Sequence, residues 1–263
     1  MTPTPQAADV MAFAVVPLAP PAARISTAKP KTAPNWALKT LMATTGSLLA
    51  LLLVIRLIVN CWFFAGAERF DAVTNRLHTF LLPYLPYDGW LWLVRGITLA
   101  LLVAHAAIAV VLALRAKAGR GPHPAKLHNG LESRLTKMMP YSGILIGLFT
   151  VIYVLDQIDH RFTDTPLMVM PCDTGTCLPS ASSYNFLADS LAVPWLAAVY
   201  IVGLLAIAVH VMHGLGTVAT IAAGNSVLLG QLRRGLAVIG GLIVGGLLLA
   251  NLFIPIGVLG GWL

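Results

Sequence analysis

The chain has 263 residues, of which 58% are hydrophobic and only 10% are charged. A soluble globular domain carries about 25% charged residues, so this composition excludes a soluble enzyme and indicates an integral membrane protein. Seventeen basic residues against ten acidic ones give a net charge of +7. Because the basic residues gather in the segments between apolar stretches, we interpret them as topology signals and exclude a nucleic-acid binder.

Five apolar stretches are long enough to cross a bilayer, whose hydrocarbon core needs about 20 helical residues. The segment before residue 36 is rich in Pro, Ala and Thr and is predicted to be disordered. The sequence therefore predicts an all-α integral membrane protein, with a disordered tail over 1–35 and a five-transmembrane-helix bundle over 36–263. The predicted spans lie near 40–64, 90–114, 140–159, 191–213 and 235–258.

The basic residues indicate the orientation. The N-terminal tail and the segments 115–139 and 214–234 carry twelve of the seventeen Lys and Arg residues, with Asp9 and Glu132 as their only acids. Lys and Arg in short loops stay on the cytoplasmic side of a membrane. We therefore expect a multi-pass protein with its N-terminus in the cytoplasm and its C-terminus outside.

Two histidines lie at similar depth in the predicted spans. His105 is about 22 Å and His210 about 28 Å from the outer ends of their spans, at 1.5 Å per helical residue. Two histidines on different helices at one level form the arrangement that bis-imidazole haem ligation requires. The alternative is a histidine pair that only forms hydrogen bonds between helices.

The segment His-Val-Met-His-Gly at 210–214, followed by Thr217 and Gly224, resembles the His-x-x-His-Gly-x-x-Ser motif of succinate dehydrogenase membrane anchors of the cytochrome b558 type. The first span, from Thr45-Gly46-Ser47 to Phe64-Ala-Gly66, resembles the first helix of that family. The resemblance covers residues 38 to 225 in the family's order. It also includes Phe70-Asp71-Ala72, Leu77-His78 and Tyr141-Ser142-Gly143.

The resemblance implies the membrane subunit of a bacterial succinate:quinone oxidoreductase, similar to actinobacterial anchors and located in the cytoplasmic membrane. Such a subunit anchors a flavoprotein and an iron–sulfur protein and passes electrons to menaquinone. The whole complex is expected to be an oligomer. The resemblance implies that His105 and His210 bind a haem b near the iron–sulfur subunit, and that no succinate-oxidising catalytic residue lies on this chain.

The chain departs from the family at the ligands of the second, distal haem. The family's histidine positions read Arg56 and Tyr153 here, and a further one reads Asp156. We therefore expect the distal haem to be absent. Because Arg56 at membrane depth needs compensation, and Asp156 is the nearest acid by depth, we expect the two to form an ion pair.

The three cysteines, Cys61, Cys172 and Cys177, all lie on the predicted outer side, and two interpretations of them stay open. A disulfide between Cys172 and Cys177, with Cys61 as a free thiol, suits an oxidising compartment. Alternatively, a [2Fe–2S] cluster held by thiolates and a histidine would relay electrons in place of the distal haem. Its candidate ligands are Cys172, Cys177 and His160, with Cys61 or His78 completing the set.

A quinone site needs an apolar slot with a hydrogen-bond donor for each carbonyl. The inner ends of the spans supply Ser47 and His213 as first candidates, together with Tyr141, Trp36 and Lys39. The basic segment 115–137 suits either an acidic partner surface or anionic membrane lipid.

Other function classes remain as alternatives. A haem b subunit of another oxidoreductase would keep the two histidines. A small secondary transporter would use Arg56 and Asp156 as a charge relay, but such transporters carry inverted repeats, and no repeat is visible in the sequence. A cofactor-free scaffold, with structural histidines, is the third alternative.

Overall fold

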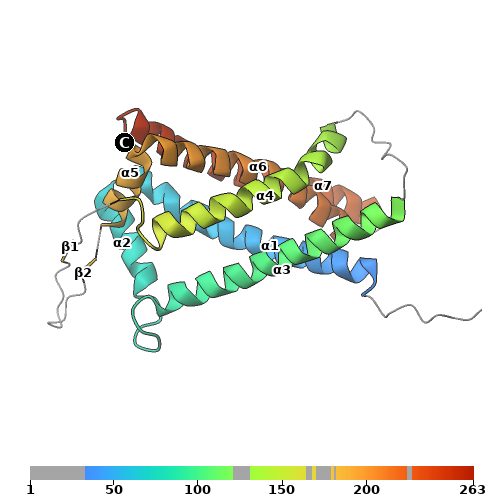
Figure 1. Ribbon diagram of the computed structural model, residues 1–263, viewed down its shortest axis with the longest axis horizontal. Coiled ribbons are helices and arrows are strands. Elements are labelled where there is room, and N and C mark those ends of the chain that lie inside the picture. Colours follow the sequence, from blue (N-terminus) through green and yellow to red (C-terminus); the bar gives the residue numbers. More distant parts are fainter. Residues whose placement is uncertain (1–32, 121–130, 164–167, 170–178, 181, 224–226) are drawn as a thin grey trace, which may run out of the picture. The chain divides into compact units, whose positions relative to one another are not determined.

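The computed structural model describes residues 33–120, 131–163, 168–169, 179–180, 182–223 and 227–263. Five long helices fill most of this part of the chain (Figure 1), and each has a segment long and apolar enough to cross a membrane. The predicted all-helical protein with five spanning helices is confirmed, whereas the orientation of the termini stays a prediction. The five helices are α1 (Asn35–Cys61), α3 (Gly89–Arg120), α4 (Leu131–Gln157), α6 (Pro194–Ala223) and α7 (Val227–Leu259).

The long helices start and end somewhat differently from the predicted spans. Helix α1 begins at Asn35, so it includes the last residue of the predicted tail, and residues 1–32 of that tail lie outside the described residues. Helices α3 and α6 run beyond the apolar core at their basic ends, to Arg120 and Ala223. A helix extends past the apolar stretch because helical backbone bonds do not need an apolar side chain.

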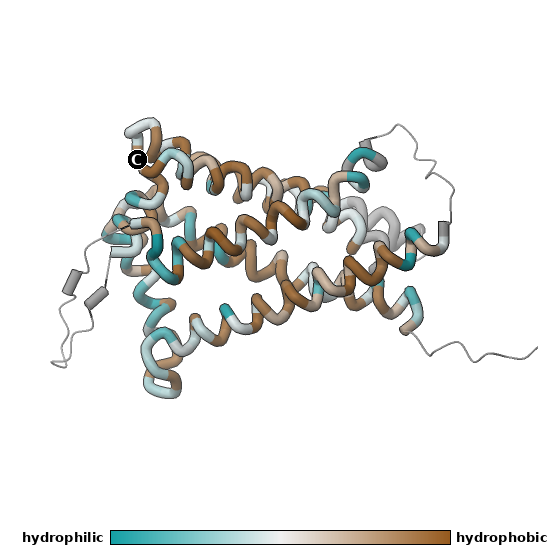
Figure 2. The backbone as a smooth tube through the Cα atoms, in the orientation of Figure 1, coloured by the Kyte–Doolittle hydropathy of each residue, from teal (hydrophilic) through white to brown (hydrophobic). Residues whose placement is uncertain are grey.

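The long helices consist mainly of hydrophobic residues along the middle of their length (Figure 2). Large aliphatic side chains there are mostly exposed, as Val103 (60%), Leu148 (60%) and Leu242 (72%) show. Exposure of so large an apolar surface to water is unfavourable, whereas the hydrocarbon chains of lipids can cover it. This surface fits a multi-pass membrane protein.

Short elements lie at one end of the bundle, where the sequence predicted the ends of spans 40–64 and 191–213 and the loops beside them. They are the 3-10 helix Trp62–Ala65, the helices α2 (Ala67–His78) and α5 (Ser183–Ala192), and the two-residue antiparallel strands β1 (Met168–Val169) and β2 (Pro179–Ser180). Two signals account for the helices. Glu68 lies in the first turn of α2 and Arg76 in its last, which complements the helix dipole, and the Ser182 hydroxyl accepts from the Asn185 backbone N–H at the start of α5.

Helix α1 lies beside α3, α6 and α7, and α6 also packs against α4 and α7. A buried apolar cluster of Leu57, Ile207, Val244 and Leu248 joins α1, α6 and α7. A second cluster, built around Phe63, Phe70, Leu191 and Leu196, fastens the short helices to the bundle. We call the end of the bundle that carries residues 62–88, 158–163 and 182–193 the α2/α5 end.

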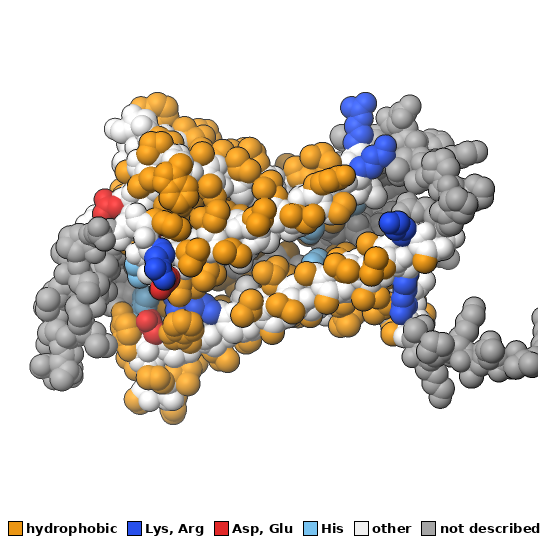
Figure 3. All heavy atoms as spheres, viewed as in Figure 1, with side chains coloured by type: hydrophobic (Ala, Val, Ile, Leu, Met, Phe, Trp, Pro, Cys, Tyr) orange, Lys and Arg blue, Asp and Glu red, His pale blue; other side chains and the backbone are white. Residues whose placement is uncertain are grey.

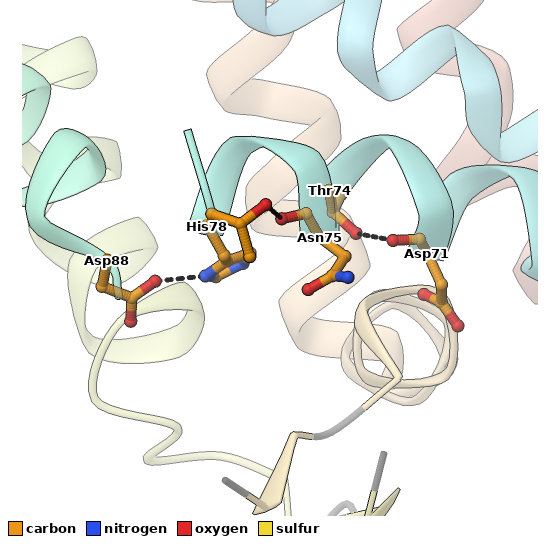
Figure 4. A network of polar contacts seen from close by, with 6 residues as sticks. Asp71, Thr74, Asn75, His78 and Asp88 are labelled. Atoms are coloured by element: carbon orange, nitrogen blue, oxygen red, sulfur yellow. Dashed lines mark hydrogen bonds and ion pairs between the residues drawn. The ribbon is translucent and has the colours of Figure 1, made fainter. Parts of the chain in front are cut away.

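A carboxylate ties the two short helices together. Asp71 of α2 accepts hydrogen bonds from the Ser182 hydroxyl (2.6 Å) and from the Tyr184 backbone N–H (2.8 Å) at the N-terminus of α5. On α2 itself, the Thr74 hydroxyl contacts the Asp71 carbonyl oxygen, as Figure 4 shows. A negative charge at a helix N-terminus is favourable, so Asp71 positions α5 over the bundle.

Helices α4 and α6 approach each other closely at Gly203. A Cβ atom added to Gly203 would lie 2.4 Å from the Phe149 ring, which itself packs edge-on against Tyr200 (5.5 Å between ring centroids). Because the ring is held by its neighbours, the missing Cβ is what lets the two helices come this near. The absence of a side chain at 203 thus sets the spacing between α4 and α6.

We predict that Gly203→Ala lowers the free energy of unfolding by about 1–3 kcal/mol through overpacking against Phe149. Gly147→Ala on α4 is the matched control, because a Cβ there meets nothing within 4 Å. Both substitutions gain the same helix propensity, so thermal unfolding of the two variants in one detergent isolates the clash. Equal stability of the two variants would contradict the prediction.

Candidate functional site

Two imidazole rings meet in the interior of the bundle. His105 of α3 and His210 of α6 lie with their ring centroids 6.3 Å apart and their planes at 69°. Histidine side chains are visible at the edges of a hollow between α3 and α4 in Figure 3. The two residues that the sequence placed at similar depth are therefore neighbours.

A hydroxyl group determines which nitrogen of His105 is protonated. The Thr45 hydroxyl donates its proton to helix carbonyls of Leu41 (2.9 Å) and Met42 (3.1 Å), and its oxygen lies 3.0 Å from His105 Nδ1. A hydroxyl has one proton, so while it donates that proton to a helix carbonyl, its oxygen accepts from the ring. In this arrangement Nδ1 carries the proton, and the Nε2 lone pair is available.

The same arrangement recurs at His210. The Ser142 hydroxyl donates to the Met139 carbonyl (3.0 Å), and its oxygen lies 3.0 Å from His210 Nδ1. His210 is therefore also the Nδ1–H tautomer with a free Nε2 lone pair. A histidine that ligates a metal usually donates its other N–H to a protein oxygen in this way.

A glycine follows each of the two hydroxyl residues. A Cβ at Gly46 would lie 3.1 Å from His105 Cε1, and a Cβ at Gly143 would lie 3.6 Å from His210 Cε1. The glycines leave the space into which each ring fits beside its hydroxyl partner. The hydroxyl–glycine pairs 45–46 and 142–143 thus form two equivalent cradles on α1 and α4.

The separation of the rings fits one metal ion between them. With about 2 Å for each metal–nitrogen bond and roughly 1 Å from a nitrogen to the ring centre, two imidazoles on one ion have centroids about 6 Å apart. Among the described residues, no group of three or more His, Cys, Asp or Glu side chains is placed to hold a metal. An ion with only these two protein ligands would need the rest of its coordination from a macrocycle such as haem.

The predicted ion pair between Arg56 and Asp156 is not formed. Asp156 is fully buried, and its carboxylate accepts from the Tyr200 hydroxyl (2.7 Å), the Ser190 hydroxyl (3.1 Å) and the Gln157 amide (2.8 Å). The Arg56 guanidinium lies instead 6.0 Å from the centroid of the Tyr153 ring. Neutral donors from α4, α5 and α6 bind the Asp156 carboxylate, and the Arg56 cation lies near an aromatic ring. The predicted partner of Asp156, which was chosen by depth in the membrane, is therefore wrong.

The described candidate iron–sulfur ligands lie apart from one another. Cys172 and Cys177 lie outside the described residues. Cys61 ends α1, where its thiol lies 3.8 Å from the Asn251 amide nitrogen. His160 packs against Phe186 (4.2 Å between centroids), and His78 contacts Asp88 and stacks on Tyr87, as Figure 4 shows for the carboxylate. Cys61, His78 and His160 are thus not brought together as one ligand cluster.

The candidate quinone residues lie mostly on the surface. Trp36 and Tyr141 are each 72% exposed, Lys39 and Ser47 are exposed, and His213 is half-buried. The buried hydroxyls are Thr45 and Ser142, two residues before Ser47 and one after Tyr141. Both residues stand in the motifs quoted from the sequence, but their role as partners of the histidines was not predicted, and the repeated hydroxyl–glycine pair was the available signal.

No protein-family model matches this chain, and no curated protein matches it.

We predict that Thr45→Val and Ser142→Ala each weaken the affinity of the purified chain for haem by about 10–100-fold, because the imidazole loses the acceptor that orients it. Thr44→Val is the control, since the Thr44 hydroxyl bonds only the Thr40 carbonyl (3.0 Å) of its own helix. The measurement is an absorbance titration with haem. Unchanged affinity in both test variants would refute the orienting role of the hydroxyls.

The separate surroundings of Arg56 and Asp156 lead to a second prediction. In double-mutant cycles of unfolding, Arg56→Gln and Asp156→Asn should couple by less than about 0.5 kcal/mol, because the two side chains do not touch. Tyr200→Phe and Asp156→Asn should couple by more than that value, because they share a buried hydrogen bond of 2.7 Å. If Arg56 couples to Asp156 more strongly than Tyr200 does, the ion pair is present and the prediction is wrong.

Proposed function

We propose that this chain is the membrane-anchor subunit of a bacterial succinate dehydrogenase, and that it passes electrons from an iron–sulfur partner subunit to menaquinone. The proposal rests on one observation above all. Two half-buried imidazoles lie with their ring centroids 6.3 Å apart, and the Nδ1 of each lies 3.0 Å from a hydroxyl oxygen. Five apolar helices and the resemblance of segments 38–225 to such anchors support the same function.

A haem b between His105 and His210 would supply a one-electron carrier inside the membrane. This chain's own contribution is to hold both rings in place and in the ligating tautomer. Thr45 and Ser142 fix the nitrogens, and Gly46 and Gly143 leave room for the rings. Apolar helix surfaces around the pair complete a setting of low polarity, which is one of the ways a protein tunes a haem.

The partner subunits would dock at the end of the bundle opposite α2 and α5. Lys39 of α1, Lys117 of α3, and Arg134 and Lys137 of α4 are all exposed there, and we call these four residues the basic end. On the face seen in Figure 3, the acidic side chains lie at the other end. The exposed candidates Trp36, Ser47 and Tyr141 would meet a quinone that arrives from the bilayer.

A relay on the outer side is a separate part of the proposal. Menaquinone reduction near the α2/α5 end would need an electron carrier where the distal haem ligands are missing. A [2Fe–2S] cluster on Cys172 and Cys177 with His160 would be such a carrier. The disulfide between the two cysteines is the alternative, and the two differ in iron and acid-labile sulfide content.

The same histidine pair also favours a second candidate, a haem b subunit of another membrane oxidoreductase. Copurifying partners distinguish the two, because only the first would bring a succinate-oxidising flavoprotein. The transporter alternative loses its main support, since Arg56 and Asp156 do not form the charge relay that it requires.

The experiment is a redox-difference absorption spectrum, with low-temperature EPR, of the complex purified through this subunit. We expect a haem b α-band, succinate-dependent reduction of menaquinone, and loss of the band in His105→Ala and His210→Ala. His213→Ala, one turn from His210, should keep the band. The absence of a haem band from the wild-type complex would overturn the haem assignment, and a complex without succinate oxidation would favour the second candidate.

A further inference from the structure

Three buried polar atoms in the membrane-spanning helices have no hydrogen-bond partner among the described residues. They are Arg56 Nε and Asn60 Oδ1 on α1 and Asn251 Oδ1 on α7. Buried polar groups almost always have a partner, and in a membrane the surrounding lipid offers none. Three unsatisfied atoms within two packed helices therefore need an explanation.

The three residues lie at the same level of α1 and α7, and the Arg56 guanidinium is directed to Tyr153 of α4. The Asn251 amide nitrogen donates to the Leu57 carbonyl of α1 (3.1 Å) and to the Leu247 carbonyl of its own helix (2.9 Å). Leu57 lies directly after Arg56, and Asn60 lies one turn after Arg56 on α1. The three side chains thus occupy neighbouring turns in the half of the bundle nearer the α2/α5 end.

The orientation of the Asn251 amide is fixed by this network. The Leu57 and Leu247 carbonyls accept and cannot donate, so the amide nitrogen faces them, and it also lies 3.8 Å from the Cys61 sulfur. The side chain is 3% exposed, so the oxygen is left inside the protein without a donor. The Asn251 side-chain oxygen is therefore a buried acceptor that lacks a hydrogen-bond donor.

The unmet groups are one donor and two acceptors, a set that an apolar ligand cannot satisfy and that water can. A water molecule offers two protons and two lone pairs, and buried water typically bridges such otherwise unsatisfied groups. Arg56 adds a reason, because its guanidinium rests on the Tyr153 ring and has no carboxylate partner, so hydration would lower the cost of its charge. An anion alone would leave both asparagine oxygens unpaired.

We propose that the bundle holds internal water at the level of α1 and α7 where Arg56, Asn60 and Asn251 keep unpaired polar atoms. The site adjoins the buried network in which Tyr200 and Ser190 donate to Asp156, because Tyr153 lies between Arg56 and Tyr200 (6.3 Å between the tyrosine centroids). Water at this site gives the outer half of the bundle an exchangeable polar interior. The inference does not depend on any haem or cluster.

The test is radiolytic hydroxyl labelling of the full chain in lipid nanodiscs, read by peptide mass spectrometry. An X-ray pulse converts bound water into hydroxyl radicals, which modify the nearest side chains. Leu57 is the reporter at the site, and Ile108 of α3 is its reference, because both are buried aliphatic residues in spanning helices (2% and 8% exposed). We expect Leu57 to be labelled severalfold faster than Ile108.

Variants assign the labelling to the site. Asn251→Leu and Asn60→Leu should each remove the excess labelling of Leu57, and Asn60→Leu leaves the Asn251 bonds to α1 in place. Thr98→Val is the control, because the Thr98 hydroxyl is already satisfied by the Val94 carbonyl (2.8 Å). It should leave the labelling of Leu57 unchanged.

Two results would overturn the proposal. Equal labelling of Leu57 and Ile108 in the wild-type chain would show that no water is present. A bound organic molecule in the native mass spectrum, lost in Asn60→Leu while Leu57 stays unlabelled, would assign the unpaired atoms to that molecule instead of water.

Discussion

The function proposed for this bundle depends on two hydroxyl groups whose protons are already committed. Thr45 and Ser142 each donate to a carbonyl of their own helix, which leaves their oxygens able only to accept from an imidazole. That restriction fixes Nδ1–H on both histidines and directs a lone pair from each ring away from its cradle. Without it, two neighbouring neutral histidines would exchange tautomers freely, and neither would be prepared for a metal.

The long helices carry two layers of polar residues, one around His105 and His210 and one around Arg56 and Asp156. The two layers differ in how their polar groups find hydrogen-bond partners. At the histidine layer, each polar group finds a partner on an adjacent helix, and the unpaired lone pairs are those that a metal would use. At the second layer, Asp156 is satisfied by Tyr200 and Ser190, while Arg56, Asn60 and Asn251 keep unpaired atoms. The first layer is thus suited to a metal cofactor, and the second to water.

The helical architecture could be predicted because it depends on composition alone. Five apolar stretches of sufficient length give five spanning helices, and depth along those helices placed His105 and His210 at one level. The partners of buried groups were harder to predict, because they depend on which faces meet. Thr45 and Ser142 face the rings although no partner was predicted for either histidine, because a shift of one or two residues along a helix turns a side chain to another face.

The misassigned partner of Asp156 has a related cause. Ser190 belongs to α5, a short amphipathic helix in a segment predicted as a loop, and Tyr200 is an apolar-looking residue within a spanning helix. Neither carries a charge, so a search for the nearest opposite charge passed over both. A buried carboxylate needs hydrogen bonds more than it needs a counter-charge, and three neutral donors met that need.

The most direct measurement of the central claim is pulsed EPR of the oxidised, purified complex. The account predicts that one haem iron, if bound, would couple to nitrogens of both His105 and His210, and that each ring would carry an exchangeable proton on its other nitrogen, bonded to Thr45 or Ser142. A spectrum with one axial imidazole, or with no haem iron at all, would contradict it.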